Sequence, residues 1–317
     1  MNKTYFEILR PGLNTTIQDR GRNHFYHVGI AVSGAIDQRN YKLANSLVGN
    51  QLTEAVIEFA YQGPLIKLKK GKIIFAITGN ILFKIVRKGS KVEDGECYKS
   101  YILEDEDQID IISTKNSAYG YLSVQGGFNL DKDWNSYSIN TKANIGPNNG
   151  KIYSLNDKIF IKKIDIKSLK NKKISYDYFS DNIIRVIKGT NFDYFSKEVQ
   201  HKFFNQEFFV TKLADRMGIR LSGYKIKNIV NTNIKSEGLV RGVIQVPADG
   251  DPIIMLSDHG TIGGYPKIGV VISADLDRVG QLTPGSTVNF KEVSLEEAQN
   301  IFKAYTEDTN KYLNENN

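Results

Sequence analysis

The feature that most constrains this chain is a succession of short, β-branched segments separated by turn residues. Four of them are rich in Ile, Val or Tyr and lie near Gly, Asn or Asp: 72–78, 81–86, 108–113 and 119–125. Runs of this length and composition are typical of β-strands. Many short strands at this spacing predict a mainly β chain built from barrels or sandwiches.

Helices are expected at only a few places. Asp37 can cap a helix that runs to Val48, because apolar side chains share one face there and Gly49 follows. Asp193 can cap a second, short helix that runs to about Phe203.

The last helix carries the clearest signal. Ser294 and Glu297 have the spacing of a capping box, in which each side chain bonds the backbone of the other residue. We expect the polar tail after Thr306 to fray.

A lysine-rich stretch at about 161–178 is the best candidate for a domain boundary. It predicts an N-terminal lobe over 1–170, a C-terminal lobe over 171–293, and a C-terminal helix and tail over 294–317. Each lobe has a Gly-Gly step before an aromatic residue, a short match that hints at duplication: Gly126-Gly127-Phe128 and Gly263-Gly264-Tyr265.

Size and cysteine content narrow the class of protein. A length of 317 residues is ample for two domains with a sizeable core. Cys97 is the only cysteine, which excludes an intramolecular disulfide and multi-cysteine zinc or iron–sulfur sites. No apolar run has the length of a membrane span, and the first residues do not have the pattern of a secretory signal. We therefore expect a cytoplasmic protein that does not associate with membranes.

The chain is basic, with a net charge of +7 and a pI of about 9.1. Such a charge can indicate nucleic-acid binding. The lysines are spread along the sequence, however, and their densest stretch, 158–173, lacks the interleaved aromatic residues that stack on bases. We expect no nucleic-acid partner.

Several catalytic motifs are absent from the sequence. It contains no phosphate-binding P-loop, no G-x-S-x-G elbow and no Met-Lys pair of the kind that carries biotin. The histidines lack H-E-x-x-H spacing, and His24 and His27 fit packing in a turn better than a metal site. We expect no metal site. The four histidines are His24, His27, His201 and His259.

Two segments rich in Gly and polar residues are candidate ligand sites. In the first, residues 11–37, glycines would let backbone amides approach a ligand while polar side chains supply hydrogen bonds and charge; the alternative is the rim of a hairpin with Arg–Asp pairs on its surface. In the second, 214–223, Asp215 beside Arg216 is either part of a site or a local ion pair. The polar candidates of the first segment are Gln18, Asp19, Arg20 and Arg22.

The third such segment is the richest and comprises 236–247 and 258–267. Its acidic and basic side chains could serve acid–base or substrate-orienting roles, and its hydroxyl and glycine amides suit an oxyanion. The alternative is a glycine-rich loop that closes a barrel. The candidates for the first role are Glu237, Asp258 and Lys267, and those for the second are Thr261, Gly263 and Gly264.

Taken together, these segments resemble the biotin-dependent carboxyltransferase family, also called allophanate hydrolase subunit 2, whose members include the C subunit of 5-oxoprolinase. The resemblance runs from about residue 8 to about residue 291. The segments that carry it are Pro11–Leu13, Thr15–Arg22, Ser33–Asp37, Ala44–Asn50, Asp215–Gly218, Ser236–Glu237, Gln245–Pro247, Gly263–Lys267 and Ala274–Leu276.

The resemblance implies two cyclophilin-like β-barrel lobes and two protein partners, a B subunit in direct contact and an A subunit that joins them. It implies an ATP-dependent enzyme that opens the lactam of 5-oxo-L-proline to give L-glutamate. This chain would be inactive by itself, and Mg-ATP would be bound jointly with the partners. No biotin would be attached to this chain. The matching segments add four substrate- or ATP-binding candidates: Ser33, Asp37, Gln245 and Tyr265.

The expected chemistry divides the candidates into three roles. Anions would be held by Arg20, Arg22 and Lys267, protons would be handled by Asp258 or Glu237, and an oxyanion would be held by Thr261 with the amides of Gly263 and Gly264.

Two other functions remain open from the sequence. One is a carboxyltransferase component that acts on urea or another amide with carboxybiotin. The other is a regulatory protein that antagonises a kinase inhibitor. In the family the third segment reads Asp-x-Gln-Thr-Thr-Gly-Gly-Tyr, whereas this chain has Gly260 and Ile262 in place of the Gln and the second Thr. These differences bear on the substrate and not on the fold.

Overall fold

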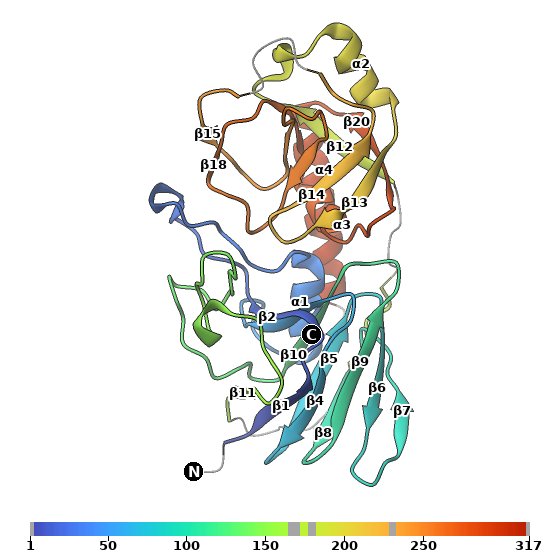
Figure 1. The fold of residues 1–317 in the computed structure, drawn as a ribbon. Coiled ribbons are helices and arrows are strands. Elements are labelled where there is room, and N and C mark those ends of the chain that lie inside the picture. Colours follow the sequence, from blue (N-terminus) through green and yellow to red (C-terminus); the bar gives the residue numbers. More distant parts are fainter. Residues whose placement is uncertain (1–2, 164–171, 177–181, 228–232, 315–317) are drawn as a thin grey trace. The chain divides into compact units, whose positions relative to one another are not determined.

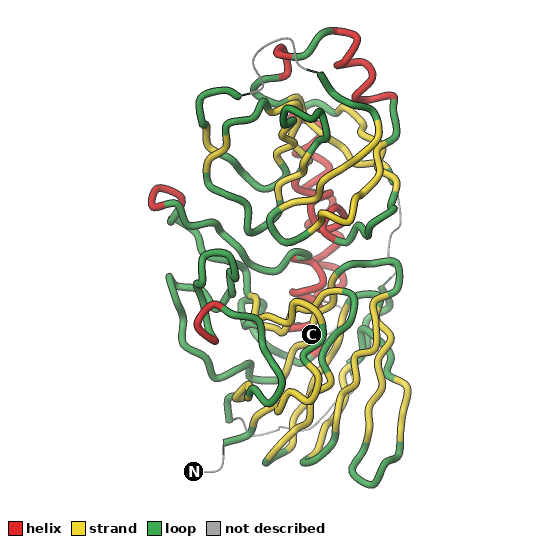
Figure 2. The backbone as a smooth tube through the Cα atoms, viewed as in Figure 1, coloured by secondary structure: helices red, strands yellow, loops and turns green. Residues whose placement is uncertain are grey.

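The computed structural model describes residues 3–163, 172–176, 182–227 and 233–314. Strands dominate the chain and helices are few (Figure 1 and Figure 2), so the predicted mainly β fold class is confirmed. The boundary predicted at 170/171 lies outside the described residues.

Contacts between residues divide the chain into two units that are not continuous in sequence. The first unit comprises Met1–Arg22, Ser33–Tyr178 and Thr309–Asn317. The second comprises Asn23–Val32 and Phe179–Asp308. Each unit therefore includes a segment that is remote in sequence from its main part.

The first unit contains two sheets. One has the strand order β11-β1-β4-β9-β6-β7 and the other has the order β2-β3-β10-β5-β8. The strands are β1 (Tyr5–Arg10), β2 (Leu13–Gln18), β3 (Val56–Ala60), β4 (Leu65–Lys69), β5 (Lys72–Thr78), β6 (Ile81–Val86), β7 (Val92–Asp94), β8 (Ser100–Glu104), β9 (Gln108–Thr114), β10 (Tyr119–Val124) and β11 (Lys158–Phe160). The strands predicted from β-branched runs coincide with β5, β6, β9 and β10.

Alternation along the strands fills the core of the first unit. In β6, Ile81, Phe83 and Ile85 are buried while the residues between them are partly exposed. This period of two places every second side chain on the inner face of the sheet. Phe59 of β3 and Phe75 of β5 join the same apolar cluster from the other sheet.

Helix α1 (Gln38–Leu47) lies on the five-stranded sheet, where Leu43 and Leu47 pack in a cluster with Ile74 of β5. The predicted N-cap is confirmed, because Asp37 Oδ1 accepts a hydrogen bond of 2.9 Å from the backbone N–H of Asn40. Asp37 is therefore a structural residue at the start of this helix.

The second unit is built around a closed seven-stranded barrel in the order β12-β19-β16-β17-β14-β13-β20 (Figure 1). A separate two-stranded ribbon, β15-β18, belongs to the same unit. The strands are β12 (Ile183–Lys188), β13 (Phe208–Ala214), β14 (Gly218–Gly223), β15 (Glu237–Gly238), β16 (Val243–Gln245), β17 (Ile253–Met255), β18 (Ile262–Gly263), β19 (Lys267–Val271) and β20 (Thr287–Glu292). The short helices are α2 (Lys197–Asn205) and α3 (Leu276–Gly280), and single 3₁₀ turns are η1 (Tyr26–Val28), η2 (Asn148–Gly150, in the first unit), η3 (Phe192–Tyr194) and η4 (Ser273–Asp275).

Helix α2 packs against the barrel through Phe203, whose ring stacks on that of Phe290 with centroids 4.6 Å apart. The predicted cap of this helix is wrong. Asp193 lies in the turn η3, and the helix begins after Ser196, whose hydroxyl accepts from the N–H of Val199 at 3.3 Å. Phe195 has an extended backbone and separates the turn from the helix.

Helix α4 (Leu295–Asn314) confirms the predicted capping box. Ser294 N–H donates to Glu297 Oε2 at 2.6 Å, and Glu297 N–H donates to Ser294 Oγ at 3.1 Å. The fraying predicted after Thr306 is wrong, because the helix continues to Asn314 and Leu313 is buried against Leu43 and Leu47. Within the described residues, no helix is both long enough and apolar enough to cross a membrane.

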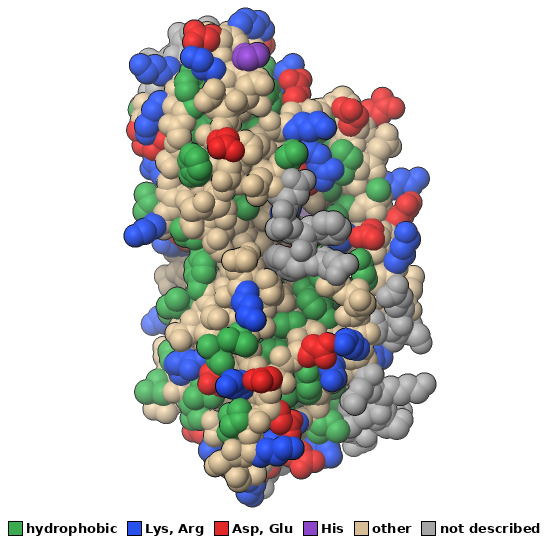
Figure 3. All heavy atoms as spheres, turned by 90° about the vertical axis from the view of Figure 1, so that its right-hand side faces the viewer, with side chains coloured by type: hydrophobic (Ala, Val, Ile, Leu, Met, Phe, Trp, Pro, Cys, Tyr) green, Lys and Arg blue, Asp and Glu red, His purple; other side chains and the backbone are tan. Residues whose placement is uncertain are grey.

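On the face shown in Figure 3, basic and acidic side chains are interspersed. Many charged groups are paired at the surface, as Lys188 is with Glu292 at 2.8 Å and Lys202 with Glu198 at 2.6 Å. Exposed pairs of this kind stabilise a fold by about 0–1 kcal/mol each.

Candidate functional site

A buried ion pair joins two of the candidate segments in the second unit. Arg216, in the turn between β13 and β14, donates from Nε to Asp258 Oδ2 at 2.8 Å and from Nη2 to Asp258 Oδ1 at 3.2 Å. The two side chains are only 5% and 3% exposed. Removing one partner from such a pair costs about 3–5 kcal/mol, because the other charge stays buried. Both oxygens of Asp258 are thus engaged, and its predicted role in proton handling stays a prediction.

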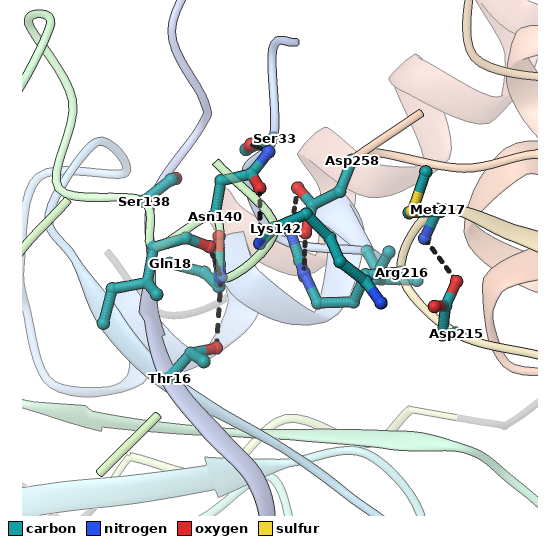
Figure 4. Close-up of polar contacts among 12 residues, drawn as sticks. Thr16, Gln18, Ser33, Ser138, Asn140, Lys142, Asp215, Arg216, Met217 and Asp258 are labelled. Carbon is teal, nitrogen blue, oxygen red and sulfur yellow. Dashed lines mark hydrogen bonds and ion pairs between the residues drawn. The ribbon is translucent and has the colours of Figure 1, made fainter. Parts of the chain in front are cut away.

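Asp215 shapes the turn that presents Arg216. Its Oδ1 accepts from the N–H of Met217 at 2.8 Å (Figure 4). It also accepts from the N–H of Gly218 at 3.3 Å. A carboxylate that bonds the backbone two and three residues ahead stabilises a turn. The predicted turn leading into a strand is confirmed by β14. The charge partner of Arg216 is Asp258, 42 residues further along the chain.

His259 lies directly after Asp258 and is 2% exposed. Its Nδ1 is 2.6 Å from the carbonyl oxygen of Gly260, and its Nε2 is 3.1 Å from the hydroxyl of Tyr26. Because a carbonyl can only accept, Nδ1 carries the proton and Nε2 accepts from Tyr26 in the neutral ring. Burial is the main cause that lowers the pKa of His259 below its ordinary value.

The sequence did not reveal this contact. His259 belonged to the richest polar segment, but nothing in the spacing connected it to Tyr26, which lies 233 residues earlier. Tyr26 belongs to the short segment Asn23–Val32, which clusters with the second unit. His24 and His27 flank it and are both exposed.

A second ion pair lies on the third segment. Lys267, at the start of β19, has a side chain only 4% exposed, and its Nζ is 2.6 Å from Oε2 of Glu237. Glu237 lies on the ribbon strand β15 and its side chain is 44% exposed. The pair therefore joins a buried ammonium to a carboxylate that faces solvent.

Gln245 lies beside this pair on the neighbouring strand. It is the register partner of Lys267, and its Nε2 donates to the carbonyl oxygen of Tyr265 at 3.2 Å. A Cβ at Gly263 would lie 2.7 Å from that Nε2, so a side chain at position 263 would displace the amide. The predicted site residues Glu237, Gln245, Gly263 and Lys267 are thus brought together.

The remaining candidates of the third segment form the loop around this group. Thr261 is half-buried, and its carbonyl oxygen accepts from the N–H of Leu239. The carbonyl oxygen of Gly264 accepts from the N–H of Ile234 at 2.9 Å, and Tyr265 is 38% exposed. The oxyanion role expected of the loop amides stays a prediction.

The departures from the family motif lie on the same loop. Gly260 is exposed, and a Cβ added there would meet only the carbonyl oxygen of Ile262, at an ordinary distance of 3.4 Å. Ile262 is 65% exposed. The backbone at position 260 therefore does not require glycine, and a longer side chain fits there.

The candidates of the first unit hold loops together. Asp19 is buried, and its Oδ1 accepts from the hydroxyls of Ser136 and Ser138 at 2.7 and 2.6 Å. Arg22 is 1% exposed and donates from Nη2 to the carbonyl oxygen of Ser138. These contacts connect segments that are remote in sequence. Arg20, between the two buried residues, is exposed.

Two further candidates in the first unit also have structural partners. Gln18 is buried and donates from Nε2 to Thr16 Oγ1 at 3.0 Å and to the carbonyl oxygen of Ile139 at 2.9 Å. Ser33 Oγ accepts from Asn140 Nδ2 at 3.1 Å (Figure 4). The alternative of a hairpin rim with Arg–Asp pairs on its surface is therefore wrong for Asp19 and Arg22, which are buried.

No group of three or more His, Cys, Asp and Glu side chains able to hold a metal ion occurs in the described part of the chain. Asp258 instead pairs with Arg216, and Asp19 accepts from hydroxyl and backbone donors.

Comparison with known proteins gives a consistent result. The chain is 29% identical over 296 residues to a protein of Escherichia coli named as the C subunit of 5-oxoprolinase, covering 92% of each chain. It is 30% identical over 302 residues to the protein of the same name from Haemophilus influenzae, covering 93% of each. It is 28% identical to the urea amidolyase of Saccharomyces cerevisiae, but it spans only 17% of that protein.

Solved structures agree with the sequence matches. The crystal structure of the Kluyveromyces lactis urea amidolyase superposes with a TM-score of 0.88 at 26% identity, covering 98% of this chain. The chain spans only 20% of that structure. The family model described as "Carboxyltransferase domain, subdomain A and B" matches residues 28–292. By this match over most of its length, the chain belongs to the carboxyltransferase domain family of subdomains A and B.

Proposed function

We propose that this chain is the C subunit of an ATP-dependent 5-oxoprolinase, which opens the lactam of 5-oxo-L-proline to give L-glutamate together with separate A and B subunits. The observation that carries the proposal is the length of the matches. Two relatives named as the C subunit of that enzyme are covered over 92% and 93% of their own chains, whereas this chain spans 17% of the yeast urea amidolyase. Because these two matches cover nearly all of both chains, the two relatives support the same role for this chain.

The second unit offers groups suited to this substrate. A lactam carbonyl is a poor electrophile, so its opening requires a fixed position for the substrate and donors for the developing charge. Lys267 supplies a buried cation for a carboxylate, and the loop 261–264 supplies backbone amides. Arg216 and Asp258 hold the turn next to this loop through their ion pair.

Two of the candidate cations already face carboxylates. These are Arg216 and Lys267, whereas Arg20 is exposed and can contact a phosphate. We therefore propose that Mg-ATP is held jointly with the partner subunits. ATP would supply the phosphoryl group that activates the lactam carbonyl.

The test is ATP-dependent release of glutamate from 5-oxo-L-proline by this chain mixed with its A and B partners. We expect turnover only when all three proteins are present, and none from this chain alone. The control is the same mixture with each protein omitted in turn. An absence of turnover with all three proteins folded and bound to each other would contradict the proposal.

A carboxyltransferase acting on urea or another amide is the second candidate. The similarity to the Kluyveromyces lactis urea amidolyase, with its TM-score of 0.88, favours it. This function predicts that carboxybiotin is consumed in the presence of urea. The two functions are separated by supplying either ATP and 5-oxo-L-proline or free carboxybiotin and urea to the same assembled proteins.

A further inference from the structure

The pair Gln245 and Lys267 has a counterpart in the first unit. Strand β16 contains Val-Ile-Gln245 and β3 contains Val-Ile-Glu58. Gln245 is the register partner of Lys267 on β19, and Glu58 is the register partner of Tyr121 on β10. Directly opposed residues on neighbouring strands present their side chains on the same face. Both units therefore place two polar residues opposite each other on an antiparallel strand pair, and in the second unit the register shifts between Ile244 and Gln245.

This correspondence differs from the Gly-Gly match seen in the sequence. Gly126-Gly127 follows β10, whereas Gly263-Gly264 precedes β19. The two glycine steps thus lie at opposite ends of the strands that correspond. The polar pairs, and not the glycine steps, occupy equivalent positions.

In the first unit, backbone N–H groups of the chain bind the corresponding polar pair, Glu58 and Tyr121. Glu58 is fully buried, and its Oε2 accepts from the N–H of Ile36 at 2.8 Å. The hydroxyl of Tyr121 accepts from the N–H of Asp37, also at 2.8 Å. Two consecutive backbone N–H groups of the chain therefore bind this pair.

In the second unit the pair has different contacts. Gln245 directs Nε2 to the carbonyl oxygen of Tyr265, which leaves Oε1 as the acceptor, and no residue in the described ranges donates to it. Lys267 is buried, and within the same ranges its ammonium group binds only the carboxylate of Glu237. Here, an acceptor and a cation belong to paired residues, where the first unit binds N–H groups.

Glu237 holds the cation from the solvent side. It lies on a ribbon of two residue pairs that is separate from the barrel sheet, and both residues of its strand are exposed. Its side chain is 44% exposed, whereas that of Lys267 is 4% exposed. A change of the Glu237 rotamer would open a path from solvent to the buried ammonium without moving the barrel.

We propose that Gln245 and Lys267 bind a small molecule that carries a carboxylate next to an amide N–H, and that Glu237 occupies the carboxylate position when this ligand is absent. The ligand carboxylate replaces Glu237 on Lys267, and the ligand N–H donates to Gln245 Oε1. A lactam acid and an N-acylated α-amino acid both have these groups on adjacent atoms. The assignment rests on the proposed function, since 5-oxo-L-proline is one such lactam acid.

The test is direct binding to this chain by calorimetry with three probes. These are 5-oxo-L-proline, 2-pyrrolidone, which lacks the carboxylate, and cyclopentanecarboxylate, which lacks the lactam. Glu237→Gln removes the competing charge and keeps the shape of the side chain. If the closed state is populated about tenfold over the open one, the variant binds 5-oxo-L-proline about tenfold more tightly. Lys267→Met should weaken the same binding by about tenfold or more, because it removes the cation.

Matched controls separate this effect from a general change in charge. Glu198→Gln removes one member of an exposed ion pair on α2 in the same unit and should leave all three affinities unchanged. Binding of 2-pyrrolidone should not respond to Glu237→Gln. An unchanged or weaker affinity of Glu237→Gln for both carboxylate probes would overturn the proposal.

The same experiment distinguishes this inference from the proposed function. If the assembled enzyme does not turn over 5-oxo-L-proline but Glu237→Gln still tightens the binding of cyclopentanecarboxylate, the carboxylate site stands and the proposed reaction fails. If turnover occurs while Glu237→Gln weakens binding of 5-oxo-L-proline, the reaction stands and the displacement of Glu237 is refuted.

Discussion

The imidazole of His259 is buried between the carbonyl oxygen of Gly260 and the hydroxyl of Tyr26. Its two ring nitrogens have different partners, so one tautomer is fixed. Protonation of Nε2 would replace an accepted hydrogen bond by a second N–H beside a hydroxyl, at a residue that is only 2% exposed. The fold therefore favours the neutral ring.

This state predicts a dependence of stability on pH. The pKa of His259 in the folded chain lies below 6.5, its ordinary value, chiefly because of burial. As pH falls below about 6.5, the unfolded ring binds a proton that the folded ring does not, so stability is lost until the folded pKa is reached. We expect His259→Asn to lose less free energy of unfolding over this range than the wild type, with a difference in slope of up to about 1.4 kcal/mol per pH unit.

The measurement is urea unfolding of both proteins at a series of pH values from 7.5 to 5.5, taken as about one unit on each side of the ordinary pKa. His201→Asn, at an exposed position on α2, is the control and should retain the wild-type slope. Parallel curves for the wild type and His259→Asn would contradict the expected role of burial.

Among the elements, α2 shows that a cap depends on the backbone before it. Asp193 and Ser196 are both residue types that cap helices well. Ser196 takes the role because its extended backbone directs Oγ to the N–H of Val199, whereas Asp193 lies in the turn η3.

The corresponding prediction compares two alanine substitutions three residues apart. Ser196→Ala should lower the free energy of unfolding by about 1 kcal/mol, because it removes the cap. Asp193→Ala should change it by less than about 0.5 kcal/mol. Denaturant unfolding of both variants gives the comparison, and a larger loss from Asp193→Ala would contradict the assignment of the cap.

Local patterns predicted the elements well. The boundaries of β5 and β6 follow from β-branched runs between turn residues, and the capping box at Ser294 follows from its spacing to Glu297. Each of these signals is formed by residues that are close together in the sequence. It can therefore be recognised without knowledge of the fold. The predicted fraying of α4 failed because a distant cluster, and not local propensity, stabilises its last turns.

The site could be predicted only in part. The third candidate segment contains Glu237 and Lys267, and these two side chains form an ion pair in the structure. The partnership of Arg216 with Asp258 and that of Tyr26 with His259 could not be predicted, because both depend on how remote strands and loops meet. Asp37 was a binding candidate through the family resemblance, and the structure confirms the helix cap that the sequence also predicted for it.

At the scale of the whole molecule, neither unit is a continuous stretch of sequence. The end of α4, from Thr309, belongs to the first unit, while the rest of this helix belongs to the second. Leu313 is 7% exposed and lies in one cluster with Leu43 and Leu47. The stability of the first unit therefore depends on side chains near the other end of the sequence.

A substitution at each end of α4 tests this dependence. Leu313→Ala should lower the free energy of unfolding of the first unit by about 2–5 kcal/mol, because it leaves a cavity in the cluster. Leu295→Ala, at a position 62% exposed on the same helix, should change it by less than about 0.5 kcal/mol. The fluorescence of Trp134, the only tryptophan, reports on the first unit. If the two variants lost the same free energy of unfolding, the docking of Leu313 would be contradicted.

The docking of Leu313 also affects the order of events during synthesis. A ribosome releases the chain from its N-terminus at about 5–20 residues per second, so the strands of the first unit emerge well before α4. The cluster around Leu43 and Leu47 lacks Leu313 until the second unit has been translated. Although the first unit is the earlier of the two to leave the ribosome, it is the later to complete its core.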